Sequence, residues 1–317
     1  MSAMIRARVA AAAVALAVSI PVLAVDSVKM MIPANPGGGW DTTGRELGKA
    51  MQSSGAVKNV QYDNKGGAAG TIGLAQFVNS AKGDPNALLM SGMVMVGGII
   101  QNKSAVNLSQ VTPVARLTSE WEVIVVPANG PKTLKELLDK FKANPGSVSW
   151  GGGSAGGTDH ILAGLVAKAV GVEPAKVNYI PFKGGGEAVS AIIGGHVTAG
   201  ISGISEFAQH IKTGKMRALA VSSPKAIDGI ASLKEQGVDV ELSNWRGIFA
   251  APGITKAQRD ELIQAVEKAV KSPAWQETLK RQDWTDFWLA GDAYGQYVEE
   301  ENKRLGEILG ALSLGKK

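Results

Sequence analysis

The 317-residue sequence contains no cysteine and only three histidines. Without cysteine the chain forms no disulfide and performs no thiol chemistry. His160, His196 and His210 lack the spacing of metal ligands, so the sequence predicts no zinc site. We therefore expect neither a metal nor another cofactor.

Runs of basic residues are also missing. The formal net charge of +5 falls by two, to +3, when Arg6 and Arg8 at the N-terminus are left out. The other lysines and arginines are scattered and are not interleaved with aromatic residues. This pattern argues against nucleic acid as a partner.

The N-terminus has the features of a secretory signal peptide. Arg6 and Arg8 precede an apolar run, Val9 to Val18, and a small-residue site ends at Ala24. The run is shorter than the roughly 20 residues of a membrane span, which is the alternative interpretation. We expect residues 1–24 to be removed and the mature protein to be soluble in the periplasm.

Short apolar runs alternate with helical patterns along the rest of the chain, which is typical of α/β proteins with largely parallel sheets. The strands we expect cover residues 27–33, 57–65, 87–96, 111–130, 147–153, 177–182, 197–203, 217–223 and 244–255. The helices we expect open near residues 40 and 71 and cover residues 132–146, 158–172, 187–195, 255–271 and 292–312.

Two of these strands are long enough to cross between domains, with hinge segments at residues 120–127 and 244–251. The first domain would combine residues 25–126 with 249–317, and residues 127–248 would form the second. The sequence thus predicts an α/β fold of two lobes, with the two crossing strands as a hinge. Small ligands would bind in the cleft between the lobes.

Glycines gather in four turns, each between an expected strand and an expected helix: residues 37–39, 66–70, 151–157 and 184–186. A helix N-terminus presents unpaired N–H groups and a partial positive charge. Glycine lets an anion approach those groups closely. With two turns in each lobe, the pattern favours facing anion-binding loops, although any single turn could serve chain geometry alone.

Polar neighbours of these turns have two possible roles. Thr42, Thr43, Thr71, Ser154 and Thr158 could cap helices, bind a carboxylate, or do both. For Asp41 we favour the N-cap of the first helix, and the alternative is that it holds the loop amides or a water in place. Trp40 could be a core residue or a lid on the ligand. His160 could touch the ligand, but packing at the lobe interface is favoured.

Signals for catalysis are weak. Gly151, Gly153 and Gly156 match the dinucleotide pattern G-x-G-x-x-G, yet Phe182 and Lys183 stand where an acidic residue is expected. No GxxxxGK[ST] or G-x-S-x-G sequence occurs, and Ser154, Asp159 and His160 are too close in sequence for a serine triad. We expect a binding protein and not an enzyme; a nucleotide-binding enzyme remains the minor alternative.

The segments NPGGGWD, NKGGAAGTIG, GSVSWGGGSAGGTDH, YIPFKGGGEAVSAIIGGHV and GKMRALAVSS occur in this order. Together they resemble the solute-binding proteins of tripartite tricarboxylate transporters, the Bug or TctC-like family, over essentially the whole mature chain. The resemblance implies a periplasmic Venus-flytrap protein of type II that delivers carboxylates to a permease with one large and one small subunit. A sensory binding protein for a two-component system would share this sequence.

The resemblance also implies ligand-binding residues. These are Gly38, Gly39, Trp40, Asp41, Ala69 and Thr71 in the first lobe and Ser154, Ala155, Gly157, Thr158 and Gly185 in the second. Ser202 is a further candidate, although the segment ISGISEFAQ departs from the longer, proline-containing stretch of many relatives.

The form PGGGWD resembles the branch associated with citrate and similar tricarboxylates. The ligand we expect is a small di- or tricarboxylate, with metal-chelated citrate left open. We expect amides and hydroxyls to hold it, and no arginine in the site.

Overall fold

The structure is a computed structural model that describes residues 26–182 and 185–311. The expected signal peptide lies outside the described residues, as do Lys183 and Gly184, the first residue of the fourth glycine turn. Within the described part, no helix combines the length and the apolar character that a membrane span requires.

One hydrogen-bonded sheet path runs through the molecule in the order β2-β1-β3-β9-β4-β7-β5-β6, and β8 and β10 pair with β4. The strands are β1 (Ser27–Ile32), β2 (Asn59–Asn64), β3 (Ala87–Gly92), β4 (Thr112–Pro127), β5 (Ser149–Gly152), β6 (Asn178–Pro181), β7 (Ala199–Gly203), β8 (Met216–Val221), β9 (Ser243–Ala250) and β10 (Thr285–Ala290). Strand β1 is parallel to β2 and β3, and β5 is parallel to β6 and β7.

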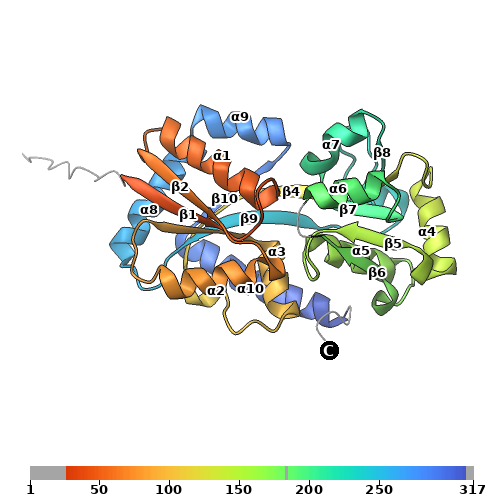
Figure 1. Cartoon of the computed structure of the whole chain (residues 1–317), viewed down its shortest axis with the longest axis horizontal. Helices are drawn as coiled ribbons and strands as arrows, with labels where there is room; N and C mark the ends of the chain where they lie inside the picture. The colour runs from red at the N-terminus through yellow and green to blue at the C-terminus, as the bar shows by residue number, and fades with distance from the viewer. Residues whose placement is uncertain (1–25, 183–184, 312–317) are drawn as a thin grey trace, which may run out of the picture.

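Strand β4 belongs to both halves of the molecule. Residues 112–121 pair with β9, and residues 122–127 pair with β7 and β8. Figure 1 shows β4 and β9 lying between one half that holds β1, β2 and β10 and another that holds β5 to β8. The domain boundaries expected from the sequence remain a prediction.

Helices cover the sheet in both halves (Figure 1). They are α1 (Gly39–Ser53), α2 (Thr71–Ser80), α3 (Met93–Gln101), α4 (Leu134–Ala143), α5 (Thr158–Ala169), α6 (Gly185–Ile193), α7 (Ile204–Lys212), α8 (Lys256–Val270), α9 (Pro273–Gln282) and α10 (Gly291–Ala311). Helix α1 packs on α8 and α9, and α10 packs on α3 and β4. Strands and helices alternate along most of the chain, as is typical of an α/β fold.

Most of the expected elements are present. The long strand at residues 111–130 is confirmed as β4, and α4 begins after Thr133, whose side chain accepts a hydrogen bond of 3.1 Å from the Glu136 amide. The Glu136 side chain accepts from the Lys132 amide and not from the Thr133 amide, so Thr133 and Glu136 do not form a reciprocal capping box.

Some elements differ from expectation. The strand expected at residues 87–96 ends at Gly92, and α3 follows directly. Most of α3 is buried, so its sequence is apolar on all sides and lacks the 3.6-residue periodicity that would have predicted a helix. The sequence analysis also missed α7, α9 and β10. On α2, Ile72 is 49% exposed, whereas Leu74 and Phe77 are buried in the core.

Candidate functional site

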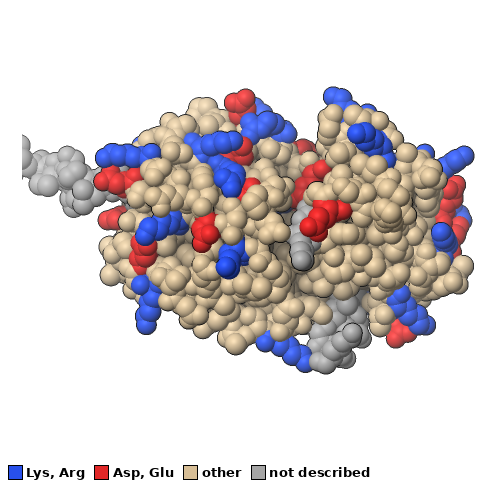
Figure 2. Space-filling view, viewed as in Figure 1, with Lys and Arg blue, Asp and Glu red and all other residues tan. Residues whose placement is uncertain are grey.

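A cavity lies between the two halves, at the carboxyl ends of β1, β2, β5, β6 and β7. The space-filling view shows a notch in the surface between the halves, with acidic and basic side chains interspersed around it (Figure 2). The cavity is lined by Pro33, Ala34, Gly38, Gly39, Trp40, Gly66, Gly67, Ala69, Gly70, Val94, Gly153, Ser154, Gly157, Thr158, Asp159, Phe182, Ala188, Ser202, Gly203, Glu206, Asn244 and Arg246.

Five helices lack a capping side chain; four of them have their N-cap residue in the cavity lining, and the fifth, α3, contributes Val94 to it. Helices α1, α2, α3, α5 and α7 have glycine as N-cap residue: Gly38, Gly70, Gly92, Gly157 and Gly203. Helices α4, α8 and α9 contribute nothing to the lining, and they are capped by the side chains of Thr133, Thr255 and Ser272. First-turn N–H groups and the positive ends of several helix dipoles are thus available to an anion in the cavity.

Two lining side chains have buried polar atoms without a partner. Thr158 is fully buried and Asn244 is 7% exposed. Among the described residues, neither the Thr158 hydroxyl nor the Asn244 side-chain oxygen has a hydrogen-bond partner. An unpaired buried polar group costs about 1–3 kcal/mol, so such groups are rare unless a bound molecule satisfies them. Both atoms are therefore available to a polar ligand in the cavity.

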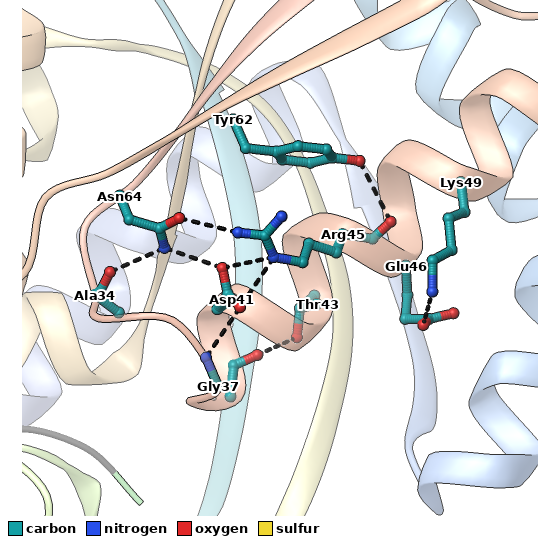
Figure 3. Close-up of polar contacts among 10 residues, drawn as sticks. Ala34, Gly37, Asp41, Thr43, Arg45, Glu46, Lys49, Tyr62 and Asn64 are labelled. Atoms are coloured by element: carbon teal, nitrogen blue, oxygen red, sulfur yellow. Dashed lines mark hydrogen bonds and ion pairs between the residues drawn. The ribbon is translucent and has the colours of Figure 1, made fainter.

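Asp41 holds the first glycine turn from outside the cavity (Figure 3). Its carboxylate accepts hydrogen bonds from the Gly37 amide at 3.0 Å, from Arg45 Nε at 2.9 Å and from Asn64 Nδ2 at 2.9 Å. Burial acts to raise the pKa of Asp41, but these bonds outweigh it and the pKa lies below its usual value. The N-cap role that we favoured is wrong, because Gly38 is the N-cap residue; Asp41 takes the alternative role of holding the loop.

A buried arginine lies at the floor of the cavity. Arg246 of β9 forms an ion pair with Glu120 of β4 and donates a hydrogen bond of 3.2 Å to the Thr43 hydroxyl. Glu120 also accepts hydrogen bonds from Trp284 Nε1 at 3.0 Å and from the Ser205 hydroxyl at 2.9 Å. The expectation of a site without arginine is therefore wrong.

Carboxyl groups gather on the side of the second half. Asp159 accepts a hydrogen bond of 2.5 Å from the Gly153 amide, and burial raises its pKa to about 6. Burial, followed by the charge of Glu120, raises the pKa of Glu206 to about 7. Glu122 is fully buried behind Asp159, and burial raises its pKa well above the usual value. These groups do not form a metal site: within residues 26–182 and 185–311 no three His, Asp or Glu side chains are placed to hold an ion.

The two halves touch across the cavity. The backbone of α3 at Gly97 approaches the loop before α5 so closely that a β-carbon on Gly97 would lie 2.1 Å from the Gly156 carbonyl oxygen. Val94 of α3 lies on the same side, since a β-carbon on Gly157 would be 3.3 Å from its side chain. Only glycine at position 97 permits this approach of the halves.

The structure brings most of the expected site residues together. The cavity lining includes Gly38, Gly39, Trp40, Ala69, Ser154, Gly157, Thr158 and Ser202. It does not include Asp41, Thr71 or Ala155. Thr71 instead donates a hydrogen bond of 2.9 Å to the Ala68 carbonyl, and Gly185 begins α6. Whether the lining residues bind a ligand remains a prediction.

Two aromatic side chains had open roles. Trp40 is a core residue, since it is only 7% exposed and packs in the core, and it also lines the cavity; its role as a lid on the ligand stays a prediction. His160 does not line the cavity; its ring stacks on Tyr179 with 4.2 Å between centroids, and its Nδ1 accepts from the Gly156 amide at 3.1 Å. Burial lowers the pKa of His160 to about 4, so the ring is neutral at physiological pH.

Sequence reasoning missed Glu206, Asn244 and Arg246 as lining residues. Glu206 lies on α7, a helix that the sequence analysis did not identify. Asn244 and Arg246 lie two residues apart on β9 and therefore share one face of the strand. Two polar residues at alternate positions of an otherwise apolar strand were the available signal.

A family model described as the tripartite tricarboxylate transporter family receptor, TctC, matches residues 45–314. The protein BugT of Bordetella pertussis is 27% identical over 309 residues, covering 95% of this chain and 94% of BugT. A UPF0065 protein of Cupriavidus necator, from the gbd 5' region, is 28% identical over 297 residues, covering 91% of this chain and 88% of the relative.

Solved structures show the same fold. The periplasmic binding protein BugD superposes with a TM-score of 0.82 at 23% identity, covering 91% of this chain and 98% of BugD. MatC of Rhodopseudomonas palustris with bound malate has a TM-score of 0.80 at 22% identity, covering 90% and 99% of the two chains. Rpa4515 of R. palustris with adipate has a TM-score of 0.81 at 19% identity, covering 91% and 97%. The periplasmic-binding-protein fold expected from the sequence is thereby confirmed.

Proposed function

The chain belongs to the receptor family of tripartite tricarboxylate transporters, and we propose that it captures a small di- or tricarboxylate in the cavity between its halves and delivers it to a permease of that transporter class. The family consists of receptors, so the chain is a binding protein and not an enzyme. We also propose that it acts in the periplasm after removal of residues 1–24.

One observation carries the proposal. The helices that begin at the cavity have bare glycine N-caps, whereas α4, α8 and α9, which begin elsewhere, have side-chain caps. A helix without a capping side chain keeps its first N–H groups for another acceptor. Carboxylates are such acceptors, and uncapped helices from both halves, α1 and α5 among them, face one cavity.

Binding would close the two halves on the ligand. Helix α1 of one half and α5 of the other supply separate sets of amides, so a ligand with two carboxylates can contact both. Such a ligand stabilises the closed arrangement, because only there are both sets within reach. The segments of β4 and β9 at residues 120–127 and 244–251 would act as the hinge, and the permease would recognise the closed shape.

A thermal-shift experiment tests the proposal. The mature protein is unfolded, washed and refolded to remove ligand carried over from the cell, and then melted with citrate, isocitrate, tricarballylate, C4–C6 dicarboxylates, terephthalate or NAD. A ligand at 100 times its dissociation constant adds about 2.7 kcal/mol, which raises the melting temperature by on the order of 5 °C.

The expected result is a shift with a few carboxylates and none with NAD. Gly39→Val serves as the binding-deficient variant, because a β-carbon there would lie within 3 Å of both the Arg246 guanidinium and a Glu206 carboxylate oxygen. Gly306→Ala on α10 is the control, since a β-carbon there meets nothing within 4 Å. A melting temperature that rises only with NAD would overturn the proposal. So would a melting temperature that rises with none of the carboxylates.

A further inference from the structure

Glu206 places a free carboxylate oxygen in the cavity. Its Oε2 accepts a hydrogen bond of 3.0 Å from the Ser202 hydroxyl. Its Oε1 has no hydrogen-bond donor among residues 26–182 and 185–311. This oxygen reaches across to the other half, because a β-carbon on Gly39 would lie 2.9 Å from it. An acceptor oxygen thus lies beside the uncapped end of α1, where a ligand carboxylate is expected.

Asn244 supplies a second acceptor without a donor. Its side-chain oxygen is buried and unpaired, as described above. Asn244 is the register partner of Glu120 on the neighbouring strand. Glu120 is already engaged by Arg246, Ser205 and Trp284, so it is not the group that needs a ligand. The oxygens of Glu206 and Asn244 remain for a donor that the ligand would bring.

A ligand that carries only carboxylates does not match these two oxygens. The only guanidinium among the described lining residues, that of Arg246, is paired with Glu120, while Asp159 and Glu206 add acidic groups to the lining. Above the pKa of Glu206, which is about 7, a ligand carboxylate beside the free Glu206 oxygen would meet like charge, which disfavours binding. A hydroxyl or an ammonium group beside it would donate a hydrogen bond, strengthened by charge in the case of ammonium.

We propose that Glu206, assisted by Asn244, is a specificity-determining residue that selects carboxylates bearing a hydroxyl or ammonium group on a carbon next to a carboxylate or between carboxylates. This inference rests on the proposed carboxylate-binding function. It narrows the ligand class to hydroxy- and amino-substituted di- or tricarboxylates. Their unsubstituted counterparts would fit the same amides but leave the two oxygens unpaired.

Matched ligands test the inference. Dissociation constants are measured by calorimetry at pH 8.5 for succinate, malate and aspartate, and for tricarballylate and citrate, which differ only by a hydroxyl. The wild-type protein is compared with Glu206→Gln, which keeps the size of the side chain and removes its charge. Glu277→Gln is the control, because Glu277 is exposed and lies far from the cavity lining.

The expected result is that within at least one matched set the substituted acid binds at least tenfold tighter than its unsubstituted partner. In Glu206→Gln, the preference for an ammonium-bearing ligand over its unsubstituted partner falls below threefold. The preference for a hydroxyl-bearing ligand falls to half of the wild-type value or less. The unsubstituted acid binds as tightly as it does to the wild-type protein, or more tightly. Glu277→Gln keeps the wild-type preference.

Equal affinities within the sets, or a preference that Glu206→Gln leaves unchanged, would overturn the inference while the carboxylate function stands. If only the unsubstituted acids bind, the inference is likewise overturned while the carboxylate function stands. If no carboxylate from these sets or from the larger panel binds, the proposed function fails as well, so the two failures are distinguishable.

Discussion

Arg246 and Glu120 form an ion pair that is almost completely shielded from solvent, with side chains 3% and 1% exposed. The pair joins β9 to β4 below the cavity. Taking two charges out of water is costly, and the pair compensates for that cost only while both partners are present.

We therefore expect Arg246→Met to lower the free energy of unfolding by about 3–5 kcal/mol, because it leaves Glu120 buried and unpaired. The double variant Arg246→Met/Glu120→Gln should recover at least half of the loss. Asp139→Asn breaks the exposed pair with Lys135 and should cost about 1 kcal/mol or less. Urea unfolding of the four proteins measures these differences, and a double variant no more stable than Arg246→Met would contradict the pairing.

The unpaired hydroxyl of Thr158 leads to a second prediction. Thr158→Val replaces a buried, unpartnered hydroxyl by a methyl group of similar size. Stability should be unchanged or higher, whereas affinity for the ligand should fall about tenfold, since one hydrogen bond is lost. Thr43→Val is the matched variant: its hydroxyl donates to the Gly39 carbonyl at 2.8 Å and accepts from Arg246, so stability should fall by about 1 kcal/mol. A Thr158→Val protein that unfolds more easily but binds normally would speak against a ligand contact.

Gly97 and Gly98 are neighbours with different surroundings. A β-carbon on Gly97 would collide with Gly156 of the other half, whereas one on Gly98 would lie 2.4 Å from the Ala69 β-carbon in the same half. Opening of the halves relieves the first collision but not the second. Gly97→Ala should therefore weaken ligand binding about tenfold or more and leave the ligand-free melting temperature within about 2 °C of wild type. Gly98→Ala should lower that temperature clearly, and the same response from both variants would exclude Gly97 as a closure contact.

The pH dependence of stability follows from four groups. The pKa values of Glu206 and Asp159 rise to about 7 and about 6 in the folded protein. The stability that these groups contribute is therefore fully present below their pKa values in the unfolded chain, and it is lost as the pH rises through 6–7. Burial raises the pKa of Glu122 well above its usual value, so Glu122 acts in the same direction as Glu206 and Asp159. The pKa of His160 falls to about 4, so its contribution is present above 6.5 and is lost as pH falls. The carboxyl of Asp41, whose pKa is lowered, titrates below this window.

From pH 8 to pH 5 the three carboxyl groups outweigh the histidine, and the free energy of unfolding should rise by at least about 2 kcal/mol. Glu206→Gln should reduce this rise, and His160→Gln should enlarge it. Urea unfolding at pH 5, 6, 7 and 8 provides the measurement. A stability that falls between pH 8 and pH 5 in the wild-type protein would show that these carboxyl groups are ionised in the folded state.

Features encoded locally were predictable from the sequence. The glycine turns at Gly38–Gly39 and at Gly157–Thr158 each follow a strand and open a helix within a few residues, and both are in the cavity lining. The buried helix α3 was not predictable in this way, because an apolar run without periodicity fits a strand equally well.

The polar residues at the floor of the cavity are brought together by contacts between segments that lie far apart in the sequence. Arg246 reaches Thr43 and Glu120, which lie more than 100 residues away in the chain. This contact is set by the register of β9 against β4, and no local pattern records that register. The role of Asp41 was similarly hidden, because it depends on Asn64 from the neighbouring strand.

Because strand β4 pairs with strands of both halves, it affects how the protein unfolds. Residues 123–125 are held on both sides by β7 and β8, and residues 115–119 of the same strand are held by β9 and β10. Melting either half would strip one continuous backbone of its partners and expose unpaired groups in the other half. We expect the halves to unfold together as one cooperative unit, and neither to persist as an independent fragment after proteolysis.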